Sequence, residues 1–191
     1  MADGQASRRR LLDAAAAEFA TWGLAGARVD RIAATSKVNK QQMYAWFGNK
    51  TDLFDAIWTE SVNEIVDAVP LTADDLPGYA TRLYDAYLGS PHLVRLSAWA
   101  RLERIPTGNL FAHMAKSDEK KHQSIADAQA AGHIDAGYAP QDVHSLVIAM
   151  SMAWSPASTL VAASPEDTAA EHARRKKALA TAVDGAFRPK S

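Results

Sequence analysis

The amino-acid sequence predicts an all-α protein. Apolar residues recur at the three- and four-residue spacing of helices, no run shows the sustained alternation of a β-strand, and glycines and prolines separate the runs. The chain has 191 residues, of which 48% are hydrophobic and 23% charged. This composition provides enough apolar surface for a packed core and is not typical of a disordered protein.

Two helices are expected before the residue 36–38 segment. An amphipathic stripe runs from Leu12 to Ala20 with the spacing of one helix face, and Gly23 marks its end. Val29 and Ile32 then begin a second, shorter apolar face. We therefore predict a first helix that ends near Gly23, followed closely by a second, shorter helix.

Capping signals indicate where the next two helices begin. Asn39 precedes Gln42 by three residues, and Asn49 precedes Asp52 by the same spacing. In such a capping box each side chain satisfies a free amide of the other residue. Pro70 marks the end of the fourth helix, which we expect to be long. The two predicted helices cover about residues 40–46 and 50–69.

The remainder of the chain is expected to form longer helices separated by prolines and a glycine-rich turn. Residues 145–165 carry no formal charge and are long enough to span a membrane. Several serines and the internal Pro156 instead favour a buried helix followed by a turn. The predicted helices cover about residues 73–89, 92–104, 107–131, 140–155 and 166–187.

Composition excludes several classes of site and location. There is no cysteine, which rules out disulfides, thiolate metal sites and a cysteine nucleophile. Residues 8–17 begin with basic residues and continue with apolar ones, but Asp13 and Glu18 interrupt the pattern, so we do not interpret them as a targeting segment. We expect a cytoplasmic protein that does not associate with a membrane.

Charge is unevenly distributed. Residues 1–50 contain eight Lys and Arg against four Asp and Glu, whereas the remainder contains 13 against 18, within a net charge of −1. A basic first quarter on an acidic body is expected where one part of the protein meets an anionic partner. The asymmetry alone is a weak indication, because basic N-termini are common.

The three short N-terminal helices have the layout of a helix-turn-helix unit, with its tight turn at residues 36–38. The third helix of such a unit enters the major groove, and its first turn faces the base edges. Amide side chains suit adenine, and Lys suits guanine or a phosphate. The expected base-reading residues are Asn39, Lys40, Gln41 and Gln42. The expected phosphate contacts are Arg28, Arg31, Lys37, Tyr44 and Lys50, and Trp46 is either a packing residue or a groove-edge contact.

Residues 8–57 resemble the DNA-binding domain of the TetR family of transcriptional regulators. The resemblance rests on RRRLLDAAAAEFATWG, VDRIAATSKVNKQQMYAWF and NKTDLFDAI. The residues that match the family pattern are Ile32-Ala33, Val38, Tyr44, Phe47 and Lys50. Three positions depart from it: Arg28 stands where the family often has Thr, Gln41 where it often has Gly, and Trp46 where it often has His or Tyr. These departures concern base preference rather than the docking mode.

The resemblance implies a dimeric repressor that binds a double-stranded DNA operator and is released by a small-molecule effector. Tyr44 and Lys50 would contact phosphates. Residues 1–50 would form the DNA-binding domain, the helix at about 50–69 would link it to the body, and residues 51–191 would form the ligand-binding and dimerisation domain. Effector binding would move that helix and change the separation of the two recognition helices.

The resemblance does not identify individual residues in the body, and our assignments there rest on residue type. Aromatic and Met side chains between helices favour a hydrophobic or aromatic effector, although for any single one of them ordinary core packing is the more common explanation. The candidate pocket residues are Tyr84, Tyr87, Trp99, Phe111, Met114, Met150 and Trp154. The resemblance implies that the last two helices make the dimer interface, where they would form a four-helix bundle with a second copy. The candidate residues of this homodimer interface are Val143, Leu146, Val147, Ala173, Ala180, Val183 and Phe187.

An enzyme is the alternative from another functional class. Ser117 and Lys120 have the spacing of a nucleophile and its base, but no companion motif is present. Glu119 and His122 have the spacing of a di-iron ligand pair, yet such sites need two pairs. The sequence has no Gly-rich phosphate loop. We therefore expect no catalytic activity, no metal and no cofactor, and ligand binding without turnover would separate the two hypotheses.

Overall fold

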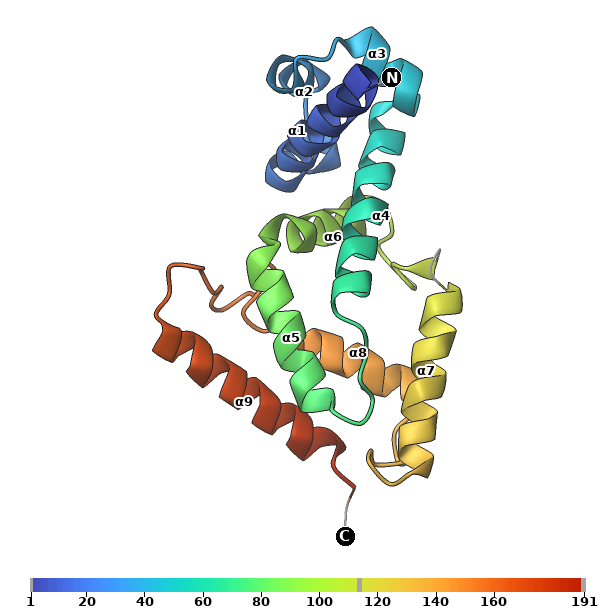
Figure 1. Cartoon of the computed structure of the whole chain (residues 1–191), viewed down its shortest axis with the longest axis vertical. Helices are drawn as coiled ribbons and strands as arrows, with labels where there is room; N and C mark the ends of the chain where they lie inside the picture. The colour runs from blue at the N-terminus through green and yellow to red at the C-terminus, as the bar shows by residue number, and fades with distance from the viewer. Residues whose placement is uncertain (1, 113–114, 190–191) are drawn as a thin grey trace. The chain divides into compact units, whose positions relative to one another are not determined.

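A computed structural model of the chain describes residues 2–112 and 115–189, and within these residues all regular secondary structure is helical (Figure 1). The predicted all-α fold is therefore confirmed. The helices are α1 Ala2–Gly26, α2 Val29–Ser36, α3 Lys40–Phe47, α4 Lys50–Ala68, α5 Leu76–Gly89, α6 Pro91–Glu103, α7 Ala115–Ala130, α8 Pro140–Ser151 and α9 Ala169–Phe187.

The chain forms two compact units, and neither is continuous in sequence. Unit 1 comprises Met1–Ile65 and His92–Leu110, and unit 2 comprises Val66–Pro91 and Phe111–Ser191. The expected boundary at residue 50 does not coincide with this division. Most of α4 and almost all of α6 belong to the same unit as the helix-turn-helix.

The core of unit 1 holds the three N-terminal helices together. Phe19 of α1 and Phe54 of α4 are fully buried and meet edge to face, with ring centroids 5.2 Å apart. Ile32 of α2 and Met43 of α3 are also buried, at 0% and 1% exposure. Burial of each such side chain contributes roughly 1.5–3 kcal/mol. Each short helix is therefore anchored by its own apolar residue on a shared core.

A sharp break in α1 occurs at Gly23, where the sequence predicts the helix to end. Gly23 has φ 67° and ψ −178°, a conformation that is essentially restricted to glycine. The turn that follows exposes new amide groups, and the carboxylate of Glu103 in α6 accepts from Leu24 N at 2.6 Å and from Ala25 N at 3.1 Å. The indole Nε1 of Trp99, also in α6, approaches Ala20 O at 3.4 Å. Helix α6, through Glu103 and Trp99, therefore stabilises the break in α1.

The turn between α2 and α3 depends on Ser36 and Lys37. Lys37 has φ 57°, in the left-handed region. The hydroxyl of Ser36 accepts from Val38 N at 3.2 Å, and both Ser36 and Val38 are buried. This turn directs α3 away from α2, as the helix-turn-helix prediction requires.

Unit 2 is built around α5, α8 and α9. Helix α9 lies against α5 along its length, α8 packs against both, and α7 packs against α8 (Figure 1). The core contains fully buried aliphatic residues of α7, α8 and α9, among them Ile125, Val143 and Val183. Phe187 at the end of α9 meets Tyr138 edge to face at 5.4 Å.

Several predicted helix boundaries differ from the structure. The expectation of a helix from residue 107 is wrong, because residues 107–112 form turns and α7 begins at Ala115. Gly108 has φ 76°, and the Arg101 guanidinium donates to Ile105 O at 2.8 Å and Gly108 O at 3.0 Å. Helices α5 and α9 begin three residues later than predicted, at the caps Asp75 and Thr168. In the described ranges, no helix combines the length and apolarity needed to cross a membrane.

We predict that Gly23→Ala lowers the stability of the protein by about 2–4 kcal/mol, because the added methyl group meets both backbone strain and a packed ring. A Cβ at this position would lie 2.8 Å from Trp99 atoms and 2.9 Å from the Glu103 Oε1. Denaturant unfolding would measure the loss. Gly89→Ala is the matched control, because its added methyl group meets nothing within 4 Å. Equal stability of the two variants would contradict the role assigned to Gly23.

Candidate nucleic-acid interface

The first turn of α3 is fixed by its N-cap and by one buried side chain. The side-chain Oδ1 of Asn39 accepts from Gln42 N at 2.8 Å, which confirms the N-cap half of the predicted capping box. Met43 packs into the core of unit 1, so the opposite side of α3 faces solvent. The cap uses one of the two lone pairs of the Asn39 oxygen and leaves both donors of its amide NH₂ unused by this hydrogen bond.

The exposed side of α3 carries the residues that the sequence predicts as DNA contacts. Gln41 and Gln42 are exposed, and Tyr44 is 43% exposed. Trp46 and Phe47 are half-buried, and the Arg8 guanidinium lies 5.0 Å from the centroid of the Phe47 ring. The amide side chains of Gln41 and Gln42 therefore face solvent, whereas the half-buried Trp46 ring is partly covered by the protein.

Lys40, the first residue of α3, forms an ion pair with Asp30 in the first turn of α2. The hydrogen bond and the charge of Asp30 raise the pKa of Lys40 above its ordinary value. This pairing was not predicted from the sequence. It joins the N-terminal ends of the two helices of the helix-turn-helix.

Glu18 of α1 organises the start of α2. Its Oε1 accepts from Arg28 N at 2.8 Å and from Arg31 Nε at 2.7 Å. Burial would raise the pKa of Glu18, but these hydrogen bonds outweigh it and hold the pKa below its ordinary value. Arg28 makes no side-chain cap, as expected where Arg replaces Thr, and its side chain is exposed. Arg31 is instead committed to Glu18 and to the face of Trp22, whose ring centroid is 5.0 Å from its guanidinium.

Lys50, at the start of α4, holds the chain between α1 and α2. Its ammonium donates to Ala27 O at 3.1 Å and lies 3.5 Å from Ala25 O. The sequence indicated only a phosphate contact for this residue. A lysine ammonium has three donors, so the backbone bonds leave capacity for a phosphate.

Unit 2 contains a small cavity of about 30 Å³. Its walls are mainly aromatic and proline side chains with two serines, and its lining residues are Tyr84, Tyr87, Leu88, Pro91, Ser151, Trp154, Ser155, Pro156, Ala163 and Pro165. Three predicted pocket residues, Tyr84, Tyr87 and Trp154, lie in this wall. Water fits a cavity of this size, but an aromatic ligand would have to enlarge it.

The other predicted pocket residues lie elsewhere. Trp99 belongs to unit 1 and packs beside Gly23. Phe111 and Met150 belong to unit 2 but do not line this cavity. Met114 lies outside the described residues.

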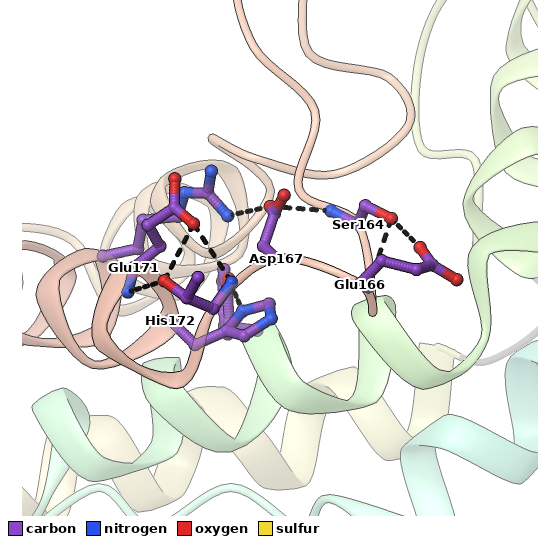
Figure 2. A network of polar contacts seen from close by, with 8 residues as sticks. Ser164, Glu166, Asp167, Glu171 and His172 are labelled. Atoms are coloured by element: carbon purple, nitrogen blue, oxygen red, sulfur yellow. Dashed lines mark hydrogen bonds and ion pairs between the residues drawn. The ribbon is translucent and has the colours of Figure 1, made fainter.

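A polar network holds the wall of the cavity to the start of α9 (Figure 2). The Tyr84 hydroxyl lies 2.7 Å from Nδ1 of His172, and Tyr84 also meets Trp154 edge to face at 6.3 Å. Asp167 accepts from Ser164 N at 3.0 Å and from Arg175 Nη1 at 2.5 Å. The hydrogen bonds from the Ser164 backbone and the Arg175 guanidinium hold the pKa of Asp167 below its ordinary value.

The sequence did not identify Arg175 as a member of this network. It belongs to the basic run Arg174–Lys177, yet Arg175 is only 5% exposed. Its spacing of four residues from Leu179, and again to Val183, places it on the buried side of α9. This spacing is the feature of the sequence from which the burial of Arg175 could have been predicted.

The comparisons with known proteins agree with this layout. Residues 11–57 match the model for bacterial regulatory proteins of the tetR family, and residues 75–184 match a C-terminal domain described as tetracyclin repressor-like. The chain belongs to the TetR family of transcriptional regulators. Proteins of this family are regulators and not enzymes, which agrees with the expectation of no catalytic activity.

Individual relatives of this TetR-family regulator support the assignment. The HTH-type transcriptional repressor SCO4008 of Streptomyces coelicolor is 38% identical over 152 residues, which cover 78% of each chain. The crystal structure of SCO4942 from the same species, described as a transcriptional regulator, is 35% identical and has a TM-score of 0.78, with 95% of this chain and 98% of the other covered. GusR of Salmonella enterica shares the fold, with 22% identity, 94% coverage of both chains and a TM-score of 0.67.

The structure places the predicted dimer residues of this regulator in two different environments. Val143, Val147, Val183 and Phe187 are almost fully buried in the core of unit 2 itself, where they are not available to a second copy. Leu146 is 42% exposed, Ala173 is exposed and Ala180 is half-buried. The sequence could not separate these two sets, because both faces of α8 and α9 carry apolar residues.

Glu119 and His122 have the spacing of a di-iron ligand pair, but the sequence analysis found no second pair and predicted no metal site. Among the described residues, no group of three or more His, Cys, Asp and Glu side chains is arranged to hold a metal ion. His122 instead meets His144 of α8 edge to face at 5.6 Å. Burial lowers the pKa of His144 to about 4, so this ring is neutral at pH 7.

We predict that Asn39→Ala destabilises unit 1 by about 1 kcal/mol and weakens DNA binding, because the amide of Gln42 loses its cap. Thermal unfolding and a duplex-binding titration would measure the two effects. Asn39→Ser is the control, since a serine hydroxyl can accept the same hydrogen bond. If Ala and Ser variants behave alike, the cap does not stabilise the recognition helix.

We predict that Asp167→Asn lowers the unfolding temperature at pH 7 and flattens its dependence on pH below about 4. The lowered pKa of Asp167 means that its stabilising effect is present above the ordinary value of 3.8 and disappears as pH falls through the folded-state pKa. Unfolding scans between pH 2.5 and 7 would test this. Asp127→Asn is the control, an exposed carboxylate of α7 that accepts from Gln123. An identical pH profile for both variants would contradict the prediction.

Proposed function

We propose that this TetR-family regulator is a repressor that binds an inverted-repeat operator as a homodimer in the cytoplasm and is released by a small aromatic effector. One observation carries the DNA-binding part: the first turn of α3 is capped by Asn39, anchored by Met43 and exposes Gln41 and Gln42. Repression is supported by the relative SCO4008, which is itself a transcriptional repressor.

The readout follows from side-chain chemistry. Gln41 and Gln42 each offer one donor and one acceptor, which match the N7 and N6 groups of adenine. Tyr44 and Lys50 contact phosphates on either side and fix the register of α3 in the groove. Two copies related by a two-fold axis place two recognition helices on successive major grooves, about 34 Å apart.

The homodimer uses the outer faces of α8 and α9. Leu146 and Ala173 are exposed there, and most of the exposed residues of α9 are small, which allows close approach of a second helix pair. The two helix pairs then form a four-helix bundle.

The effector binds at the cavity of unit 2. Its aromatic and proline walls suit a flat apolar ring, and the small volume means that binding must enlarge the cavity. Pro91 lines this cavity and is also the first residue of α6, which continues from His92 into unit 1. A ligand that binds better to the enlarged state shifts the protein toward it, and α6 carries the change along the chain.

The first test is selection of genomic fragments on the purified protein, followed by titration of the recovered operator at several salt concentrations. We predict that Gln42→Ala lowers operator affinity about fivefold to a hundredfold and leaves affinity for random duplex nearly unchanged, because one base-reading side chain is lost. Failure of the wild-type chain to enrich any inverted repeat would contradict the proposed function. Equal losses on operator and random DNA would contradict base reading by Gln42.

The effector site is tested by filling the cavity. Ala163→Phe places a ring in the cavity, whereas Ala162→Phe adds the same ring at an exposed neighbouring position. We expect Ala162→Phe to bind operator and to be released, like the wild type, by compounds such as indole, phenol or benzoate. Ala163→Phe should bind operator weakly even without a compound and respond little to one, because its own ring enlarges the cavity as an effector would. Equal release of both variants would place the effector elsewhere.

A further inference from the structure

The ion pair between Lys40 and Asp30 lies at the surface where the proposed function places DNA. Both side chains are exposed, Lys40 at 50% and Asp30 at 77%. Asp30 is the single acidic residue in the sequence from Ala27 to Gly48. An acidic group is unfavourable on a surface that meets phosphates, because it repels them. The presence of Asp30 on this surface therefore suggests that it has a function that compensates for its repulsion of phosphates.

The local structure holds Asp30 in place. It lies in the first turn of α2, where the free amides and the helix dipole favour a carboxylate. The start of α2 is itself fixed, because Arg28 N donates to Glu18 at 2.8 Å. Asp30 thus places a negative charge, on a backbone position that is held by Glu18, beside the first residue of the recognition helix.

The Lys40 ammonium can occupy many positions unless another group restrains it. Its ammonium is a compact charge on a flexible four-carbon chain, and it can contact any phosphate within reach. As the first residue of α3 it also stands at the positive end of a helix dipole, which disfavours a cation. Pairing with Asp30 offsets that effect and limits the positions that the ammonium occupies. Three donors on the ammonium allow it to keep Asp30 and still donate to a base.

We propose that Asp30 is a positioning residue for base recognition, which holds the Lys40 ammonium at the start of α3 so that it donates to one base-edge acceptor and not to neighbouring phosphates. The acceptor that suits a lysine in the major groove is O6 or N7 of guanine. The inference rests on the proposed function. It assigns to Asp30 a contribution to specificity that is independent of direct contact with DNA.

The alternative is that Asp30 only repels phosphates. A double-mutant cycle separates the two explanations, because positioning acts through Lys40 and repulsion does not. The set comprises wild type, Asp30→Asn, Lys40→Gln and the double variant. Asp127→Asn is the charge-matched control, since it removes one exposed carboxylate from α7 in unit 2. Asp30→Glu is the conservative variant that keeps the charge.

Affinities are measured for the selected operator, for the same duplex with the guanines of each half-site replaced one at a time, and for a random duplex, at 50–200 mM salt. Asp30→Asn is expected to raise affinity for random duplex about threefold to tenfold, because Lys40 gains a phosphate. The slope of log affinity against log salt should steepen by about 0.9 per subunit. Operator affinity should change less than threefold, so that the ratio of operator to random affinity falls. Preference for one guanine should weaken, and Asp30→Glu should largely restore it.

In the Lys40→Gln background, Asp30→Asn should change the ratio of operator to random affinity less than twofold. A similar gain on both duplexes, present also in that background and without a steeper salt slope, would show that Asp30 acts by repulsion and would overturn the inference. So would no change, or a loss on both duplexes with a lower unfolding temperature. If the wild-type chain binds no duplex selectively, the proposed function itself fails. These outcomes are distinct, because the positioning of Lys40 is judged only on a wild-type protein that binds its operator.

Discussion

The DNA-binding unit depends on how the break at Gly23 is stabilised. A helix that stops inside a compact unit leaves free amides and carbonyls, and these must find partners. Glu103 accepts from the amides of Leu24 and Ala25, Lys50 donates to the carbonyl of Ala27, and Glu18 accepts from the amide of Arg28. Three charged side chains from three helices therefore define the path from α1 into α2. The orientation of the recognition helix follows from that path, because α3 packs on α2.

In unit 2, polar groups of the backbone also have to be paired outside a helix, in the segment between α8 and α9. The segment between these helices consists of turns, and its C-terminal end is held by the hydrogen bonds of Asp167 to Ser164 N and to Arg175 and by the capping box of Thr168 and Glu171 (Figure 2). The same segment supplies part of the cavity wall, through Trp154, Ser155, Pro156, Ala163 and Pro165. These hydrogen bonds therefore restrain one side of the cavity.

The candidate site was predicted well where its signals were local. The cap formed by Asn39 and the exposure of Gln41 and Gln42 follow from spacing within one turn of helix. The partners of Lys40 and Lys50 did not follow, because each comes from a different helix and the choice between a protein group and a phosphate depends on folded geometry. Contacts with DNA were predicted for both residues, and the structure adds an intramolecular partner for each.

The helical class, most helix positions and the family could be predicted from the sequence, because periodicity, caps and the N-terminal motif are short-range properties. Which apolar faces point inward depends on the tertiary structure. It placed Val143 and Val183 in the core of their own subunit and left Leu146 exposed. In the structure Trp99 packs at the Gly23 break in α1 and does not line the cavity. The physical reason is that a helix with two apolar faces satisfies the same periodicity whichever face is buried, and only packing against distant segments selects one.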